Sequence, residues 1–233
     1  MVDMHCHVLY GVDDGSDSIG TSLSMLKTAR DEGVTHVILT PHYKSWKDNA
    51  SIETLRARKN EIAQRAEEEG IFMHLALGHE IFYFDGMMDD LEAGKILTLA
   101  GTDHLLVEFH PMEDFRVIQN ALYEIRANDL IPVLAHVERY DCIVRKFSYA
   151  EKLAEMGVKL QVNSGTVTKN PGFVTRQFLK KLFKEEMVEY ISTDAHDTKN
   201  RAPRMRECRK ILERKYDGAY VDRIMSKNGR KFF

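Results

Sequence analysis

The stretch DMHCHVLYGVDDG, residues 3–15, carries two histidines one residue apart and then two adjacent aspartates. If residues 1–7 form a β-strand, its period-two alternation places His5 and His7 on one face and Cys6 on the other. Two imidazoles then point into one space, which suits a metal ion because its donors must converge at about 2.0–2.2 Å. A His-x-His pair also occurs on ordinary strand surfaces, so partners elsewhere in the chain must decide whether a metal site is present.

The rest of the chain alternates short apolar segments with amphipathic segments of helical period. Strands are predicted at residues 1–7, 34–39, 72–77, 105–109, 131–135, 159–162 and 188–192. Helices are predicted at about 17–32, capped by Asp17 or Ser16, and at 51–69, 114–128, 171–186 and 202–216, with one more ending near Gly157. Residues 83–101 look irregular, and 217–233 is expected to hold a short helix and a basic end, 227–231, of solvated charge. About seven strand-helix alternations predict an α/β barrel.

Length and composition are those of a folded protein. The 233 residues suit one domain spanning 1–233, and 43% hydrophobic with 30% charged residues is a folded balance. A formal net charge of -3 argues against a nucleic-acid partner bound through a general basic face. Three cysteines without a C-x-x-C pair indicate reduced thiols, and no leader or membrane-spanning apolar run is recognised. We therefore expect a cytoplasmic protein without membrane insertion.

The carboxyl ends of all strands meet on one face of a parallel barrel, so the polar residues that follow the strands should converge there. They make nine candidate ligands with only nitrogen and oxygen donors: His5, His7, Asp14, His42, Glu80, Glu108, His136, Asp194 and His196. Because a tetrahedral zinc site uses four ligands, nine suggest two or three divalent ions that share a carboxylate. Donors of this kind favour manganese first, and iron or zinc second.

These motifs resemble a known superfamily. His-x-His at the first strand, T-P-H at the second, a glutamate after the third, A-H-x-E-R after the fifth and S-T-D-A-H after the seventh resemble the polymerase and histidinol phosphatase (PHP) superfamily. More narrowly, DMHCHVLYGVDDGS and AHVERY resemble the bacterial PHP-type protein tyrosine phosphatases of the CpsB/CapC kind, which act in capsular and exopolysaccharide synthesis. The resemblance covers essentially the full chain, with the motifs in the same order.

The resemblance implies a distorted (β/α)7 TIM-like barrel with a trinuclear metal centre. Carried over by motif, His5, His7, Glu80 and Asp194 would hold one ion, Glu80, Glu108 and His136 a second, and Asp14, His42 and His196 a third. Arg139 would bind the substrate phosphate, and Arg201 resembles a second phosphate-binding arginine. The implied substrate is the phosphotyrosine tail of a bacterial tyrosine autokinase, while the particular kinase and the oligomeric state stay open.

The expected reaction is attack of a metal-bound hydroxide on phosphorus, because metal ions neutralise the phosphate dianion and lower the pKa of a bound water. Arg139 suits the developing charge, since its guanidinium stays protonated and can engage two oxygens at once. Phenolate, whose conjugate acid has a pKa of about 10, leaves more easily than an alkoxide, so a general acid is less needed. His42, His196 and metal-bound water are alternative proton donors.

Two other functions stay open: a PHP phosphoesterase acting on histidinol phosphate, a nucleotide or a small phosphorylated metabolite, and a non-catalytic PHP module that docks to a kinase or polymerase. The complete ligand set argues against the non-catalytic module. His110 is a candidate near the site because it shares a strand face with Glu108, but its role and that of His79 stay open. His36 and His74 are expected to pack or to lie on the surface, and no role is assigned to His104.

Overall fold

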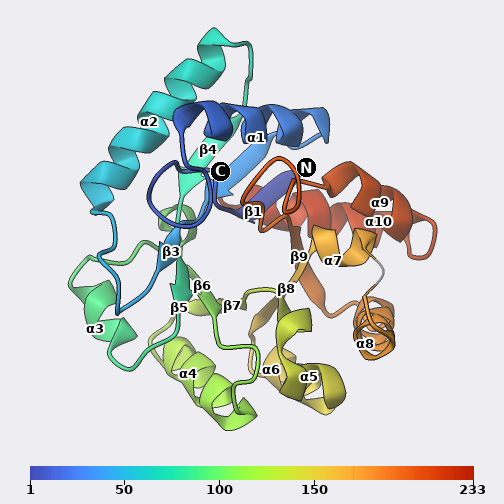
Figure 1. The fold of residues 1–233 in the computed structure, drawn as a ribbon. Helices are drawn as coiled ribbons and strands as arrows, with labels where there is room; N and C mark the ends of the chain where they lie inside the picture. The colour runs from blue at the N-terminus through green and yellow to red at the C-terminus, as the bar shows by residue number, and fades with distance from the viewer. Residues whose placement is uncertain (170) are drawn as a thin grey trace.

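The computed structural model describes residues 1–169 and 171–233 and arranges parallel strands in a ring that the helices surround (Figure 1). The strands are Val2–Cys6 (β1), His36–Leu39 (β2), His42–Tyr43 (β3), His74–Leu77 (β4), Glu80–Phe82 (β5), His104–Glu108 (β6), Ile131–Leu134 (β7), Lys159–Asn163 (β8) and Val188–Ser192 (β9). They form two parallel sheets, with the orders β1-β2-β4 and β3-β5-β6-β7-β8-β9.

The two sheets belong to one barrel because β2 continues into β3 and β4 into β5. Pro41, which has no N–H to donate, lies between β2 and β3, and the Glu80 N–H donates to its carbonyl at 3.1 Å. The ring closes where β1 meets β9: the His7 N–H donates to Ala195 O and the Asp194 N–H to His5 O, both at 2.8 Å. Counting each interrupted strand once gives seven, so the expected distorted (β/α)7 barrel is confirmed. Glu80 follows β4, as predicted, and it also begins the short strand β5, which was not predicted.

The helices lie in the crossovers between strands and after β9. They are Ile19–Asp31 (α1), Ile52–Glu68 (α2), Met87–Glu92 (α3), Phe115–Ala127 (α4), Asp141–Arg145 (α5), Ser148–Glu155 (α6), Ser164–Thr168 (α7), Phe173–Lys184 (α8), Met205–Glu213 (α9), Gly218–Asp222 (α10) and Asn228–Arg230 (α11), with 3-10 turns Leu99–Gly101 (η1) and Val137–Arg139 (η2) and the π-helical segment Arg223–Lys227 (η3). The segment predicted to be irregular, 83–101, thus contains α3 and η1. In residues 1–169 and 171–233, no helix has the length and apolar character needed to cross a membrane.

The cap predicted for the first helix was wrong. Ser18 caps α1, and its hydroxyl accepts a hydrogen bond from the Thr21 N–H at 3.2 Å. Ser16 is buried and its hydroxyl donates to the Ser18 carbonyl at 2.9 Å, so it is already used within the loop before the helix. The helix therefore begins one to two residues later than the capping pattern suggested.

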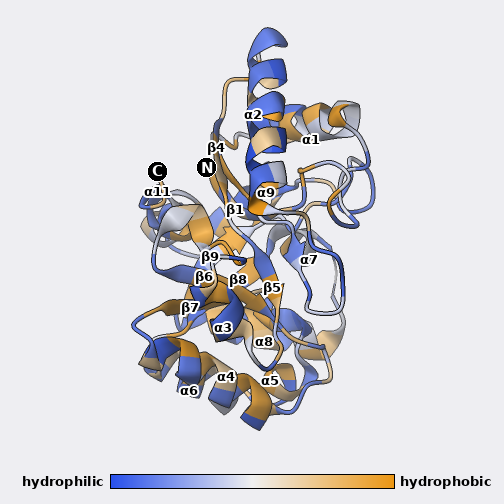
Figure 2. Ribbon diagram, turned by 90° about the vertical axis from the view of Figure 1, so that its left-hand side faces the viewer, coloured by the Kyte–Doolittle hydropathy of each residue, from blue (hydrophilic) through white to orange (hydrophobic). Residues whose placement is uncertain are grey.

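The strands pack on both faces, and many of their residues are coloured as hydrophobic in Figure 2. Side chains from one face of the strands form an inner cluster, while the opposite faces pack against the helices. The inner cluster includes the strand residues Met4, Ile38, Leu106, Val133 and Tyr190, and it also includes Phe232 from the C-terminal segment. In the same segment Gly229 lies so close to β1 that an added Cβ would stand 2.6 Å from Val2 Cγ1. The basic end, expected to be solvated charge, therefore exposes Lys227 but also packs against the barrel.

Candidate metal centre

The nine predicted ligand residues lie together at the carboxyl ends of the strands. They come from β1 and the loop after it (His5, His7, Asp14), β3 (His42), β5 (Glu80), β6 (Glu108), the turn after β7 (His136) and the segment after β9 (Asp194, His196). All are buried or partly buried except Asp14, whose side chain is 61% exposed. Parallel strands deliver these residues to one face although up to 191 positions separate them in the sequence, from His5 to His196 (196 − 5).

Glu80 is the centre of the cluster. Its Oε1 lies 3.1 Å from His5 Nε2 and 3.0 Å from His136 Nε2. Its Oε2 lies 3.2 Å from His7 Nε2 and 3.0 Å from His42 Nδ1. A carboxylate with imidazoles on both oxygens is placed to bridge two cations.

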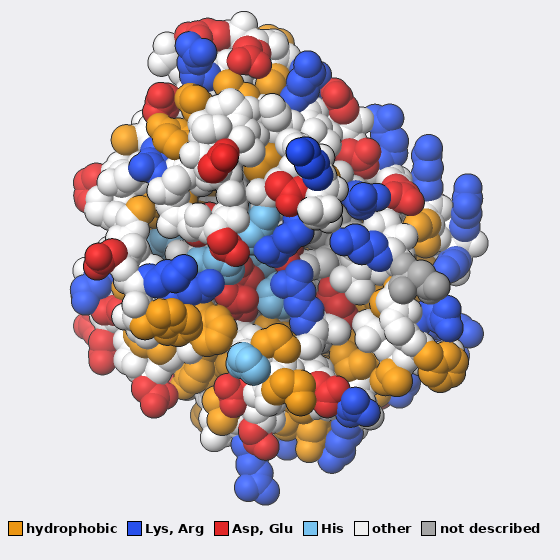
Figure 3. Space-filling model, in the orientation of Figure 1, with side chains coloured by type: hydrophobic (Ala, Val, Ile, Leu, Met, Phe, Trp, Pro, Cys, Tyr) orange, Lys and Arg blue, Asp and Glu red, His pale blue; other side chains and the backbone are white. Residues whose placement is uncertain are grey.

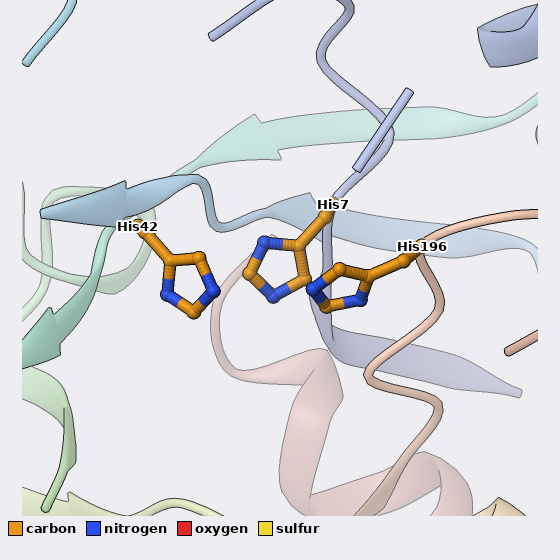
Figure 4. A group of neighbouring side chains, drawn as sticks. All are labelled: His7, His42 and His196. Atoms are coloured by element: carbon orange, nitrogen blue, oxygen red, sulfur yellow. The ribbon is translucent and has the colours of Figure 1, made fainter. Parts of the chain in front are cut away.

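The described residues contain three groups in which the ligand atoms, one from each residue, all lie within 4.8 Å of one another. The groups are His5, His7, Glu80 and Asp194; His42, Glu80 and Glu108; and His7, His42 and His196. In Figure 4 the three imidazoles of the last group converge from separate segments of the chain. The first group is the one that the family motifs implied. In the second group His42 stands where His136 was expected, and in the third His7 stands where Asp14 was expected.

The two displaced residues remain close to the groups in which they were expected. His136 Nε2 lies 3.0 Å from Glu80 and 3.5 Å from Glu108. Asp14 Oδ1 lies 3.3 Å from His42 Nε2 and 3.8 Å from His196 Nε2. Both residues therefore adjoin the groups that the motifs implied for them.

Two arginines meet the cluster at Asp194. Arg139 Nη2 donates to Asp194 Oδ2 at 2.7 Å, and Arg201 Nη2 donates to Oδ1 at 2.8 Å. Their side chains are 40% and 37% exposed, whereas that of Asp194 is 2% exposed. In the space-filling view, histidines and carboxylates form the floor of a central hollow, with lysine and arginine side chains beside it (Figure 3).

Sequence reasoning missed Asp13, which positions two of the ligands. Its Oδ2 lies 2.7 Å from His7 Nδ1 and accepts the His42 N–H at 3.0 Å, while its Oδ1 accepts the Gly15 N–H at 2.9 Å. A carboxylate on Nδ1 fixes the tautomer of an imidazole and directs Nε2 toward the cluster. The adjacent pair Asp13 and Asp14 was the available signal, but only Asp14 was selected.

Sequence reasoning also missed two hydrogen-bonded side-chain amides on β8, those of Gln161 and Asn163. Gln161 Oε1 accepts the His136 N–H at 2.7 Å, and Gln161 Nε2 donates to Asn163 Oδ1 at 2.8 Å. Asn163 Nδ2 in turn donates to Asp194 Oδ2 at 2.9 Å. Polar residues at two-residue spacing on an otherwise apolar strand are the signal that could have identified this chain.

The pKa values show that the carboxylates favour positive charge among them. Burial disfavours a charged His42, yet hydrogen bonds to Asp14, Glu108 and Glu80 raise its pKa to about 10. Burial opposes a charge on His136 as well, and hydrogen bonds to the same two glutamates raise its pKa to about 9. Burial also opposes ionisation of Glu80, but the surrounding imidazoles hold its pKa well below the usual range. A divalent cation supplies the same positive charge in place of protons.

The hydrogen bonding and the pKa of His196 indicate whether these residues fit a metal ion. Its Nε2 is buried and has no hydrogen-bond partner, although a buried polar atom is costly to leave unpaired. Burial and the positive charge of His7 lower the pKa of His196 to about 3, so its imidazole is neutral. Neutral imidazoles and ionised carboxylates are the forms that bind metals, so the donor set fits divalent cations.

The remaining histidines lie outside the cluster. His36 and His74 stack on each other with ring centroids 4.4 Å apart, and His104 Nδ1 lies 2.6 Å from Asp103. His79 is buried and its Nδ1 accepts the Leu97 N–H at 2.9 Å; burial lowers its pKa to about 4. His110 is exposed, and its Nδ1 accepts the Met112 N–H at 3.2 Å. The structure therefore does not bring His110 into the ligand groups.

A parallel barrel with histidines and carboxylates clustered at its strand ends belongs to the metal-centred class of barrel enzymes. The family described as "Capsular polysaccharide synthesis, CpsB/CapC" matches residues 1–233, and the chain belongs to this family. The family resemblance seen in the sequence is thereby confirmed.

Individual relatives agree over nearly their whole length. The chain is 28% identical to the tyrosine-protein phosphatase CpsB of Streptococcus pneumoniae, covering 99% of this chain and 97% of that protein. It is 30% identical to CapC of Staphylococcus aureus, covering 99% of this chain and 90% of that one. A chain from the crystal structures of Bacillus subtilis YwqE and S. pneumoniae CpsB, described as unique metal-dependent tyrosine phosphatases, superposes with a TM-score of 0.92 at 27% identity, covering 100% of this chain and 94% of that chain.

Proposed function

We propose that this chain is a metal-dependent protein tyrosine phosphatase whose substrate is the phosphotyrosine tail of a bacterial tyrosine kinase in capsular polysaccharide synthesis. The observation that carries the proposal is the meeting of the nine-residue ligand cluster with two arginines at one carboxylate, Asp194. The relatives named tyrosine-protein phosphatases support the substrate class, and the family description supports the role in capsule synthesis. Residues 1–233 would act as one phosphatase domain.

The ligand groups would hold two or three divalent cations, with manganese the first candidate and iron or zinc the others. His5, His7, Glu80 and Asp194 would hold one, and Glu80 would be shared with a second held by Glu108 and His42 or His136. His7, His42, His196 and the nearby Asp14 surround the third position. Bound cations neutralise a phosphate dianion and bring the pKa of a water molecule towards neutrality.

Arg139 and Arg201 bind the phosphate oxygens. Each guanidinium uses one Nη2–H on Asp194, and each has further N–H groups for an incoming anion. The two side chains are partly exposed, so a phosphoryl group can reach them from solvent. A protonated planar guanidinium can engage two phosphate oxygens, and this engagement strengthens as negative charge develops on them.

Of the three alternative proton donors, His42 and metal-bound water would be able to supply a proton to the leaving phenolate, whereas His196, whose pKa is about 3, would carry none to deliver. His42 and His196 both face Asp14 Oδ1, at 3.3 and 3.8 Å, and the exposure of Asp14 marks the side of the cluster that is open to substrate. Because phenol has a pKa of about 10, a modest proton donor is sufficient for a tyrosine substrate.

The test begins with the metal content of the purified full-length protein, measured by elemental analysis. The same sample is assayed on a phosphotyrosyl peptide, after chelation, and after reloading with Mn²⁺, Fe²⁺ or Zn²⁺ separately. We expect turnover that chelation abolishes and Mn²⁺ restores. The variant Arg139→Gln should lose activity while keeping its metal, and Arg116→Gln, an exposed arginine on α4, serves as the control.

Comparison substrates make the result specific. A metal-loaded protein that hydrolyses histidinol phosphate or another small phosphorylated metabolite with a much higher kcat/KM than the peptide would replace the proposal with a different phosphoesterase. A metal-loaded protein inactive on every phosphoester would overturn it in favour of a binding module.

A further inference from the structure

A cavity beside the metal centre is lined by four cationic side chains: Arg139, Lys169, Arg201 and Arg204. The other lining residues are uncharged, and three of them, Asn163, Thr166 and Asn200, are polar. In the part of the chain that the structure describes, no carboxylate lines this cavity. Its walls come from η2, from the end of β8, from α7 and the residue after it, and from the segment before α9.

The four cations divide into two pairs. Arg139 and Arg201 both bond to Asp194 and so face the metal centre. Lys169 Nζ instead donates to a neutral acceptor, the Asn200 carbonyl, at 3.3 Å. Lys169 and Arg204 therefore lie in the same cavity as the phosphate-binding pair, but among the described residues their side chains bond to Asn200 and Glu207 and not to a metal ligand.

The positive charge of Arg204 is only weakly neutralised by a neighbouring carboxylate, that of Glu207. Its Nη1 lies 3.6 Å from Glu207 Oε2, and both side chains are substantially exposed, at 41% and 54%, so solvent screens the pair. Its Nε atom is buried and has no hydrogen-bond partner. A buried guanidinium donor without an acceptor is costly, and an anion in the cavity would satisfy it.

The transferred phosphoryl group accounts for Arg139 and Arg201, which leaves two cations without an anionic partner of comparable strength. Because the cavity is continuous with the phosphate-binding pair, a second anion would belong to the same substrate molecule. Resting on the proposed phosphatase function, we propose that Lys169 and Arg204 form a second anion subsite, which selects phosphotyrosyl peptides carrying a further carboxylate or phosphoryl group near the reacting tyrosine.

The experiment measures kcat/KM of the metal-loaded full-length protein on four substrates. These are a small aryl phosphate, a phosphotyrosyl peptide with neutral neighbours, the same peptide with a neighbouring glutamate, and the same peptide with a non-hydrolysable phosphonate analogue of a second phosphotyrosine. We expect the two acidic peptides to be preferred over the neutral one by about tenfold, with the preference falling as salt is raised. The larger of the two preferences identifies the favoured anion.

The subsite is then removed with the double substitution Lys169→Gln and Arg204→Gln. The preference for acidic peptides should fall to about one, and Lys169→Glu alone should disfavour them. The matched control is Lys27→Gln with Arg116→Gln, which removes the same two charges from exposed positions on α1 and α4. The control should keep the preference of the unsubstituted protein.

Two results would overturn the subsite while leaving the phosphatase function intact. One is equal kcat/KM on neutral and acidic peptides in the unsubstituted protein. The other is a loss of aryl phosphate turnover in the double variant that matches its loss on acidic peptides, because the two cations would then serve the transferred phosphoryl group. Absence of turnover on all four substrates would instead contradict the proposed function itself.

Discussion

Histidines at the two ends of the barrel have opposite electrostatic surroundings. At the carboxyl ends of the strands, carboxylates raise the pKa of His42 to about 10. At the other end, His36 and His74 are paired in register on β2 and β4, and their rings stack at 4.4 Å. Among the described residues, neither of these two forms an ion pair with a carboxylate, and burial followed by the charge of His74 lowers the pKa of His36.

The difference teaches that residue type alone does not define a metal centre. His36 and His42 are six residues apart on consecutive parts of one interrupted strand, yet they lie at opposite ends of it. Of these two histidines, His42 is the one whose Nδ1 lies close to Glu80 and Glu108, at 3.0 and 3.1 Å. The carboxylates that gather at the strand exits therefore distinguish a ligand histidine from a packing histidine.

The largest expected effect comes from Glu80→Gln, which keeps the size of the side chain but removes the charge that four imidazoles contact. We expect metal content to fall and kcat/KM on a phosphotyrosyl peptide to drop on the order of 10³-fold, equivalent to about 4 kcal/mol of transition-state stabilisation. The variant His36→Gln at the other end should keep both. Equal losses in the two variants would contradict the contrast between the two ends.

A glycine substitution at each end should separate activity from stability. An added Cβ at Gly15 would stand 2.3 Å from the His7 carbonyl oxygen, whereas at Gly229 it would meet Val2 Cγ1 at 2.6 Å. Gly15→Ala must displace His7, and a shift of about 1 Å in a catalytic group costs about 10²-fold in activity. Gly229→Ala should mainly lower the free energy of unfolding, by about 1–3 kcal/mol.

Thermal unfolding and kcat/KM, measured on the same metal-loaded samples, distinguish the two outcomes. If Gly229→Ala lost activity at a temperature where it remains folded, the contact between Gly229 and Val2 would be coupled to the metal centre more strongly than the packing indicates.

A smaller loss is expected from Asp13→Asn. The substitution weakens the contact to His7 Nδ1, so Nε2 is directed less firmly toward the metal position. Supporting carboxylates of this kind are worth about 10–100-fold in metal affinity or activity. Competition with a chelator measures the affinity, and Asp17→Asn, an exposed aspartate in the same loop, is the matched control. Identical affinities in the two variants would mean that Asp13 does not position His7.

Much of this organisation could be predicted because every ligand except Asp14 lies at or just beyond a strand end, where a short apolar run followed by His, Asp or Glu is visible in the sequence. The seven-stranded count and the family followed from the same pattern. The strand ends at Leu39 and Leu77 were predicted, but the continuation of these strands as β3 and β5 was not, because it depends on how the barrel bends and on which residues it pairs.

The roles of Asp13 and Gln161 escaped for a different reason. Each acts through a hydrogen bond to a ligand residue, and that bond exists only once the loop after β1 or the strand β8 is in place. The assignment of ligands to individual groups was also beyond the sequence. Whether His42 or His136 joins Glu80 and Glu108 depends on the detailed positions of the side chains, because both imidazoles lie within 3.5 Å of these carboxylates.

The smallest expected effect concerns acid stability around His36, at the amino end of β2. The pKa of His36 is lowered by burial and by the charges of His74, Arg230 and the N-terminal ammonium, so the unfolded chain binds its proton more readily. The stability that neutral His36 contributes is complete above its unfolded pKa of about 6.5 and declines as the pH falls below that value. Because the side chain is partly exposed, solvent limits this loss to about 0.5 kcal/mol or less.

The variant His36→Gln cannot titrate, so the difference in its free energy of unfolding between pH 8 and pH 5 should be slightly smaller than that of the unsubstituted protein. Denaturant unfolding at both pH values measures this difference, and the metal centre contributes equally to both proteins. A variant more sensitive to acid than its parent would show that His36 gains a proton on folding. The two ends of the barrel would then not be electrostatic opposites.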